Sequence, residues 1–290
     1  MDRVDVGGRS ERDWEFAGPA DAMTAGAGII GYRDAGGAGV DLRVAGAASV
    51  TVLIEFGGGG LRVDDAFGSR TLGGFVAGLP LAAMRVRGER AACVEVRMSP
   101  VRAYSLLGVS PTELGRGAVA VEDLWGSRAR RLREWLASAP TWDDRFAVTR
   151  TFLAQCDRPT RTPDPEVLAS WSRILTTGGQ VRIGELAASL GWSHKRLWSR
   201  FESQIGLTPK RAAMLVRFRS AVDGLLAGRP AADVAAACGY TDQAHLCRDV
   251  STFADQTPGS LVPRYLPTVA QHRYRAWGRF VQDPAGALGR

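Results

Sequence analysis

The hydrophobic and polar positions of the first hundred residues follow the two-residue repeat of β-strands. The segments SVTVLIEF (49–56) and ACVEVRM (92–98) alternate β-branched or apolar residues with others. Successive side chains of a strand point to opposite faces, so this alternation is typical of strands with a buried face. The run GGGG at 57–60 predicts a turn between two of them. Residues 26 to about 98 are therefore predicted to form a small sheet or barrel.

From Pro100 onward, apolar residues recur at spacings of three and four, the period of an amphipathic helix. The pattern occurs in VRAYSLLG, VEDLWGSRARRLREWLAS and DDRFAVTRTFLAQC, so two to four helices are expected after the sheet. In the second segment one buried face is predicted to hold Leu124, Trp125, Leu132, Trp135 and Leu136, with arginines opposite.

The segment DRPTRTPDP at 157–165 contains three prolines and almost no large apolar side chain. Proline fixes its own backbone and disfavours helix in the residue before it, so this segment is predicted to be a linker. It divides the chain into a first domain at about 10–156 and a second domain at about 166–266. A basic tail follows at 267–290.

The second domain is predicted to be entirely helical. Its apolar spacing predicts helices at 166–177, 183–190, 194–205, 209–227, 231–238, 242–254 and 258–265. The expected fold class is therefore α+β: a small N-terminal β-sheet or barrel followed by helices, and then an all-α domain.

This helical part contains an internal duplication, in which residues 183–209 run parallel to residues 231–258 with one residue inserted in the second copy. Each copy is predicted to be a short helix, a turn at a glycine and an aromatic residue, an N-cap (Ser193, Thr241) and a second helix. That is the pattern of a helix-turn-helix unit, whose second helix enters the major groove of DNA. Trp192 and Tyr240, at the two turns, are predicted to fill the core.

One long helix connects the two copies. Thr208 caps it, Pro209 suits its first turn and Gly228 follows its end. About twenty residues of helix span roughly 30 Å, close to the roughly 34 Å of one turn of B-DNA. The two second helices are thus predicted to enter successive major grooves on one face of the duplex.

The charge distribution favours a polyanionic partner for the second domain alone. Residues 1–160 carry 20 lysine and arginine residues against 20 aspartate and glutamate residues, whereas residues 161–290 carry 17 against 10. The whole formal net charge of +7 therefore lies in the C-terminal part. A basic module joined to a neutral one indicates a nucleic acid partner, although charge alone leaves open a basic surface with no partner.

Cysteine spacing indicates no metal site. Cys93, Cys156, Cys238 and Cys247 form no CxxC pair and are expected to be small, mostly buried hydrophobes in a reducing compartment. His245 and Cys247, two residues apart on a predicted helix, point about 200° apart and cannot reach one ion. We therefore expect no metal and no cofactor.

Other classes of protein are disfavoured by the motifs that the sequence lacks. It contains no GxSxG, HExxH, GxxxxGK[ST] or paired-carboxylate motif, so we expect no enzymatic activity. No apolar run approaches the roughly 20 residues that span a bilayer, and the charged N-terminus has no secretory core. The chain is expected in the cytoplasm, without a membrane partner.

The segment LAASLGWSHKRLWSRFESQIGLTPKR, followed later by GYTDQAHLCRDV and a second Thr-Pro, resembles the AraC/XylS family of bacterial transcription regulators. The resemblance covers roughly residues 166–266, with both half-motifs and the connecting helix in order. It implies a sequence-specific regulator on the nucleoid, with double-stranded DNA, RNA polymerase, a small-molecule effector and a second copy of the chain as partners. Residues 10–156 resemble, more generically, the upstream sensing or dimerisation domains of such regulators.

The resemblance also implies which side chains meet DNA. The base-reading positions fall on Lys195, Trp198, Ser199, Gln243, Ala244, Cys247 and Arg248. Positions for the DNA backbone, or near it, fall on His194, Arg196, Arg200, Lys210, Arg211, Arg217 and Arg219. Arginine pairs bidentately with guanine and glutamine with adenine, which suits Arg248 and Gln243.

Some positions depart from the family pattern. Ser199 stands where a longer reader is frequent, Asp249 and Val250 replace a bulky apolar pair, and Asp255 replaces a turn glycine. Two alternatives stay open. One is a DNA-repair alkyl acceptor with the same helix-turn-helix module, although neither Cys93 nor Cys156 has the basic context of an activated thiol. The other is a regulator whose first domain binds only protein.

Overall fold

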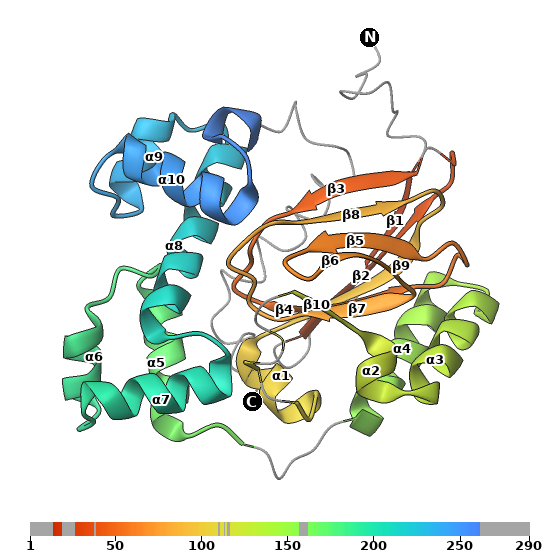
Figure 1. The fold of residues 1–290 in the computed structure, drawn as a ribbon, viewed down its shortest axis with the longest axis horizontal. Helices are drawn as coiled ribbons and strands as arrows, with labels where there is room; N and C mark the ends of the chain where they lie inside the picture. The colour runs from red at the N-terminus through yellow and green to blue at the C-terminus, as the bar shows by residue number, and fades with distance from the viewer. Residues whose placement is uncertain are drawn as a thin grey trace.

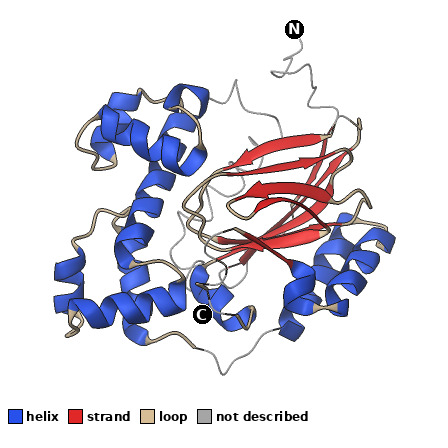
Figure 2. Cartoon of the chain, in the orientation of Figure 1, coloured by secondary structure: helices blue, strands red, loops and turns tan. Residues whose placement is uncertain are grey.

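The computed structural model describes residues 14–18, 27–37, 39–109, 111–112, 114, 117–156 and 162–261. Most of the predicted linker, the tail at 267–290 and the end of the last predicted helix lie outside the described residues. The described chain has the predicted α+β class: two β-sheets, then helices against them, then a wholly helical part (Figures 1 and 2).

Two antiparallel sheets form the N-terminal domain. The six-stranded sheet runs, in spatial order, β1 (Trp14–Ala17), β2 (Ala27–Asp34), β9 (Ala92–Met98), β4 (Val50–Glu55), β7 (Gly74–Ala77) and β10 (Ala118–Ala120). The four-stranded sheet runs β3 (Val40–Val44), β8 (Met84–Gly88), β5 (Leu61–Asp65) and β6 (Gly68–Leu72). The predicted turn at GGGG joins β4 to β5, whereas β1 and β10 lie outside the range in which the sequence predicted strands.

The central strands β4 and β9 are buried on both faces. Val52 and Val96 pack with Leu132 of α3 in one apolar cluster, on the helix side of the six-stranded sheet. Leu53 and Cys93 belong to a second cluster, shared with the four-stranded sheet. The alternation along these two segments predicted strands with one buried face, whereas every residue of β4 and β9 is buried.

Four helices follow the first nine strands: α1 (Pro100–Leu106), α2 (Val121–Trp125), α3 (Ser127–Ser138) and α4 (Trp142–Cys156). The prediction of one continuous apolar face over 121–138 is wrong, because Gly126, at φ +57°, ends α2 and redirects the chain into α3. Leu132 and Leu136 are buried as predicted. Trp135 is 46% exposed, so it lies outside the buried face that Leu132 and Leu136 form on α3.

The C-terminal part consists of α5 (Pro165–Thr176), α6 (Ile183–Ser189), α7 (His194–Ile205), α8 (Pro209–Leu226), α9 (Ala231–Ala237), α10 (Gln243–Ala254) and a 3-10 turn (Pro258–Leu261). The α-helices agree with the predicted helices within two residues at each end. In Figure 1 α8 runs between two helical groups, with α6 and α7 near its start and α9 and α10 near its end. Phe218 of α8 packs on Phe253 of α10, with ring centroids 5.0 Å apart.

The two domains touch at both ends of the helical part. In Figure 1, α1 lies between the sheets and α7. A Cβ atom on Gly206, which ends α7 at φ +94°, would lie 2.8 Å from the Pro111 carbonyl oxygen, so glycine permits this close approach. At the other end, the Gly46 amide donates to the Phe253 carbonyl at 2.8 Å.

Candidate nucleic-acid interface

The first helix-turn-helix unit consists of α6 and α7. Gly191, at φ +66°, turns the chain after α6, and the buried Trp192 fills the space under the turn. The Ser193 hydroxyl accepts a hydrogen bond from the Arg196 amide at 3.2 Å and so caps α7, as predicted. Leu197 and Phe201 are fully buried, which fixes the opposite face of α7 outward.

The second unit, α9 and α10, repeats this design with one difference at the cap. Gly239 and the buried Tyr240 form the turn. The cap is Asp242, whose carboxylate accepts from the His245 amide at 2.7 Å, and not Thr241 as predicted. The residue inserted in the second copy moves the cap position by one, so α10 begins at Gln243.

The seven predicted base-reading residues lie on the outward faces of α7 and α10. Lys195, Ser199, Gln243, Ala244 and Arg248 are exposed. Trp198 is half-buried, with its ring centroid 5.4 Å from that of the exposed His194. Cys247 is half-buried. Within the described residues, the side chains of Lys195 and Arg248 form no ion pair.

Three of the seven residues expected near the DNA backbone face the protein instead. Arg219 is 3% exposed and pairs with Asp223 at 2.6 Å, so it is not available to a phosphate. Arg217 pairs with the buried Asp249 at 3.2 Å. Arg200 is more exposed but donates through Nε and Nη2 to the two carboxylate oxygens of Asp164, each at 2.7 Å.

Arg217 is the centre of a polar cluster that joins α8 to the second unit. Its guanidinium lies 4.4 Å from the Tyr240 ring centroid, and Nη2 lies 3.4 Å from His245 Nε2. The His245 ring meets the Tyr240 ring edge to face at 5.1 Å. Burial, and next the Asp249 carboxylate, raise the pKa of Tyr240, so the phenol stays protonated. The cluster explains Asp249 at a position where an apolar residue is more usual, and it gives His245 the internal packing role.

The remaining cations of the predicted set stand on exposed positions. Lys210 and Arg211 occupy the first turn of α8, next to the capping Thr208. Arg196 is exposed and lies over the Trp192 ring, 4.5 Å from its centroid. These three side chains are exposed, whereas those of Arg217 and Arg219 are not.

Three of the four cysteines lie in the protein interior. Cys93, Cys156 and Cys238 are buried, and burial raises the pKa of the Cys238 thiol. The Arg128 guanidinium lies 3.6 Å from Cys156 Sγ, a basic neighbour that the sequence had not indicated. Among the described residues no group of three histidine, cysteine or acidic side chains is arranged to hold a metal ion. No helix in that part of the chain has the length and apolarity to cross a membrane.

A cavity of about 750 Å³ lies along the reading face of α7. It is lined by Thr112 of the N-terminal domain and by His194, Lys195, Trp198, Ser199, Glu202 and Ser203. A second cavity, of about 350 Å³, lies between the domains, where Leu81 and Met84 face Glu202 and Arg211. The face of α7 that carries the predicted base-reading residues is therefore directly beside the N-terminal domain.

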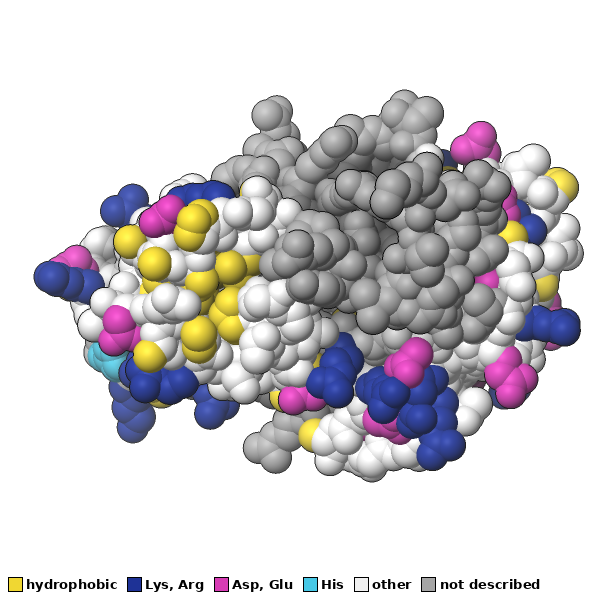
Figure 3. Space-filling view, turned by 90° about the horizontal axis from the view of Figure 1, so that it is seen from above, with side chains coloured by type: hydrophobic (Ala, Val, Ile, Leu, Met, Phe, Trp, Pro, Cys, Tyr) yellow, Lys and Arg dark blue, Asp and Glu magenta, His cyan; other side chains and the backbone are white. Residues whose placement is uncertain are grey.

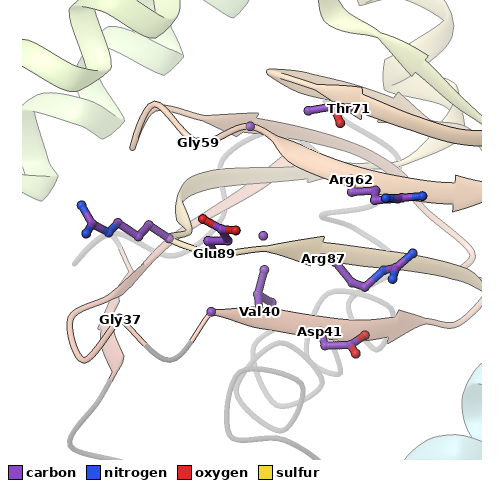
Figure 4. A pocket seen from close by; sticks show the side chains of 12 residues that line it. Gly37, Val40, Asp41, Gly59, Arg62, Thr71, Arg87 and Glu89 are labelled. Atoms are coloured by element: carbon purple, nitrogen blue, oxygen red, sulfur yellow. The ribbon is translucent and has the colours of Figure 1, made fainter.

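Another cavity, of about 860 Å³, opens on the four-stranded sheet. Figure 4 shows Arg62 and Arg87 side by side above Asp41, with Glu89 at the glycine-rich end. These arginines are already engaged, because both pair with Asp64. Figure 3 shows the same mixture of basic and acidic side chains over the sheet domain. Three of the cavity's charged lining residues, Asp41, Arg62 and Arg87, are thus held in ion pairs within the sheet.

Comparison with known proteins identifies the C-terminal part. Residues 186–263 match the family model described as a helix-turn-helix domain. This range holds α7 to α10 and most of α6, and so both units. No curated protein matches the chain.

Among solved structures, the chain resembles apo ToxT K231A from Vibrio cholerae, at 11% identity and a TM-score of 0.48, over 83% of this chain and 98% of that one. It resembles ToxT from Vibrio cholerae O395 bound to (E)-4-(8-methylnaphthalen-1-yl)but-3-enoic acid, at 9% identity and a TM-score of 0.48, over 88% and 100%. The C-terminal domain of AraT, a response regulator from Geobacillus stearothermophilus, matches at 17% identity and a TM-score of 0.33, over 38% and 97%.

Proposed function

Residues 186–263 match a helix-turn-helix family model, and from this premise we propose that the chain is a transcription regulator of the AraC type that places α7 and α10 in successive major grooves of one DNA site. The double-stranded DNA of the nucleoid is then its principal partner. The proposal assigns base reading to Lys195, Trp198 and Ser199 on α7 and to Gln243, Ala244, Cys247 and Arg248 on α10.

The observation that supports this mode of binding is the placement of two like units on one rigid connector. Helix α8 has 18 residues, about 27 Å of helix. It packs against the second unit through Phe218 and the Arg217 cluster, and it also contacts α7 of the first unit. Two recognition helices held at such a separation suit grooves that recur every roughly 34 Å. Lys210, Arg211 and Arg196 supply backbone contacts, which fix position without reading sequence.

Arg248 provides the test of base reading. Its exposed guanidinium on α10 is suited to the O6 and N7 atoms of a guanine, a contact that contributes roughly 1–3 kcal/mol of discrimination. Arg248→Ala should weaken binding to a site selected from random DNA by about tenfold, and binding to unrelated DNA much less. Fluorescence anisotropy at fixed salt measures both affinities, with Arg150→Ala in the N-terminal domain as a control. Equal losses on the two DNAs contradict base reading by Arg248.

We also assign the regulation of DNA binding to the N-terminal domain. Thr112 shares a cavity with the readers of α7, and Pro111 lies against the end of that helix. DNA entering along α7 has to displace this segment. An effector, a second copy of the chain or RNA polymerase acts, in this proposal, by changing the domain contact.

An N-terminal domain that binds only protein is the rival account of regulation. Thermal unfolding of the full chain against a library of metabolites, together with its mass in solution, separates the two. Stabilisation by a small molecule supports a sensing domain. Self-association with no such stabilisation supports a protein-binding domain.

A further inference from the structure

A small cavity in the N-terminal domain brings together arginines from three different elements. Its volume is about 380 Å³, and it lies where β2 and the turns before β5 and β9 meet α3 and α4. Arg33 comes from β2, Arg90 from the turn before β9 and Arg145 from α4. None of its lining residues belongs to the cavity along α7 or to the one between the domains.

Arg145 is buried, and its guanidinium forms no ion pair with any of the described residues. Its side chain is 6% exposed, and its guanidinium lies 5.1 Å from the ring centroids of both Phe56 and Trp142. Nε donates to the Leu136 carbonyl at 3.1 Å, which is the one hydrogen bond of the guanidinium within the described chain. Buried charges are ordinarily paired, because an unpaired charge loses its hydration without compensation. The two terminal nitrogens are therefore left for a group that enters the cavity.

Arginines outnumber acidic residues in the lining of the cavity. Burial lowers the pKa of Arg145 and the nearby Arg33 lowers it further, whereas Glu15 and Asp144 act in the opposite direction. Glu15 lies 3.7 Å from Arg33 and is only a partial counter-charge. Arg90 is exposed and has no ion-pair partner among the described residues. Asp34 is the one acidic residue of the lining, and one of its oxygens accepts from the Gly39 amide.

The rest of the lining is apolar and small. Phe56, Ala91, Ala92 and Ala137 form this wall, with Gly57 beside them. A volume of about 380 Å³ lies within the range of small-molecule sites. The site thus offers a guanidinium fork at one side and a short apolar wall at the other.

We propose that this cavity binds the carboxylate of a small organic acid. A planar guanidinium accepts a carboxylate bidentately, and Arg33 and Arg90 provide the remaining positive charge. The body of the acid rests against Phe56 and the alanines. The Asp34 carboxylate repels any second negative charge on the ligand, so the cavity favours a monocarboxylate over phosphate.

As a regulatory site, this cavity rests on the proposed function. Ligand binding here bridges β2 and α4, in the domain whose residues 111 and 112 lie against α7. The binding step itself is measurable without DNA, so the two proposals can fail separately.

Benzoate and benzamide are the matched probes, because they share shape and differ in charge. We expect benzoate, and not benzamide, to raise the unfolding temperature of the full chain at constant ionic strength, because a ligand that binds only the folded state stabilises it. Titration calorimetry gives the affinity. Arg145→Gln should weaken benzoate binding roughly 10- to 100-fold and Arg90→Gln roughly 3- to 10-fold, since each removes a charge-assisted contact.

Arg150→Gln is the control, since Arg150 is exposed on the same helix α4 and does not line the cavity. It should bind benzoate like the parent chain. If Arg145→Gln does not fold, benzoate binding by Arg90→Gln tests the proposal, because Arg90 is exposed and its substitution should not affect folding. Equal responses to benzoate and benzamide, or benzoate binding unchanged in Arg90→Gln, overturn the proposal. Tighter binding of inorganic phosphate overturns the carboxylate assignment. If the chain binds benzoate but no DNA, the proposed ligand site stands and the proposed function is refuted.

Discussion

Arg43 and Asp255, 212 positions apart in the sequence, join the N-terminal sheet to the end of the second helix-turn-helix unit. Arg43 Nη1 donates both to the carboxylate and to the backbone carbonyl of Asp255, each at 2.7 Å. Asp255 stands at φ +51°, the one non-glycine residue in the described chain with a positive φ. The residue that replaces a turn glycine thus gains a carboxylate that reaches the other domain.

Breaking this contact should favour DNA binding. Asp255→Asn removes the charge and keeps a residue that tolerates the left-handed conformation, so α10 should end as before. Exposed ion pairs contribute little, so we expect DNA affinity to rise by roughly two- to fivefold as the domains separate more easily. Anisotropy titration measures this. The matched control is Asp41→Asn, which breaks the exposed pair with Arg85 inside the sheet. Unchanged or weaker binding by Asp255→Asn refutes a restraining role for the contact.

Substitution of Arg217 on α8 should lower stability, whereas substitution of Lys210 on the same helix should change only DNA binding. Arg217→Ala leaves Asp249 buried without its partner, and we expect a loss of about 3 kcal/mol in the free energy of unfolding. Lys210→Ala should leave stability unchanged and lower the slope of log affinity against log salt by about one, as expected for a lost phosphate contact. Urea unfolding and salt-dependent anisotropy measure the two. A stable Arg217→Ala protein with a reduced salt slope reverses the assignment.

Cys247 should be the fastest of the four thiols to react. It is half-buried on the reading face of α10, between Gln243 and Arg248, whereas the other three cysteines are buried. A disulfide reagent should modify one thiol quickly and lower DNA affinity about tenfold or more, because the adduct fills the surface that meets the groove. Cys247→Ser should bind DNA and resist the reagent. Rapid modification of Cys247 without loss of DNA binding places this face away from the duplex.

The attachment of α5 to α7 should depend on pH through Asp164. The Arg200 guanidinium holds the pKa of Asp164 below its ordinary value. Its stabilising effect is then complete above the unfolded-state pKa of about 4, and is lost as the pH falls through the lower folded-state pKa. The parent chain should exceed Asp164→Asn in stability at pH 7, and the difference should shrink toward pH 3. A difference that grows on acidification contradicts this origin.

Local signals were sufficient to predict the helical part. Ser193, Thr208 and the glycines at the turns act on neighbouring residues, so caps, turns and helix limits follow from nearby sequence. The cap of α10 was misplaced by one residue, because Thr241 and Asp242 are both good caps and only the geometry of the turn selects between them.

Contacts between distant residues were not predictable in the same way. Arg217 and Arg219 look like Lys210 in the sequence, and only the packing of α8 on its neighbours turns them inward. The exposure of Trp135 depends on the backbone at Gly126. The unpaired Arg145 has no local signature at all, since α3, α4 and the sheet have to assemble before its surroundings exist.

The two units carried by α8 are alike in backbone but unlike in the side chains they present. One offers a lysine, a tryptophan and a serine, and the other a glutamine, an alanine, a cysteine and an arginine. The two sets of side chains differ in size, charge and hydrogen-bonding groups, so the two helices favour different bases. A DNA site that accommodates both therefore has a polarity. One bound molecule would therefore have a single orientation along the DNA. Inverting the site would place the N-terminal domain on the other side of it, away from a polymerase bound on the first side.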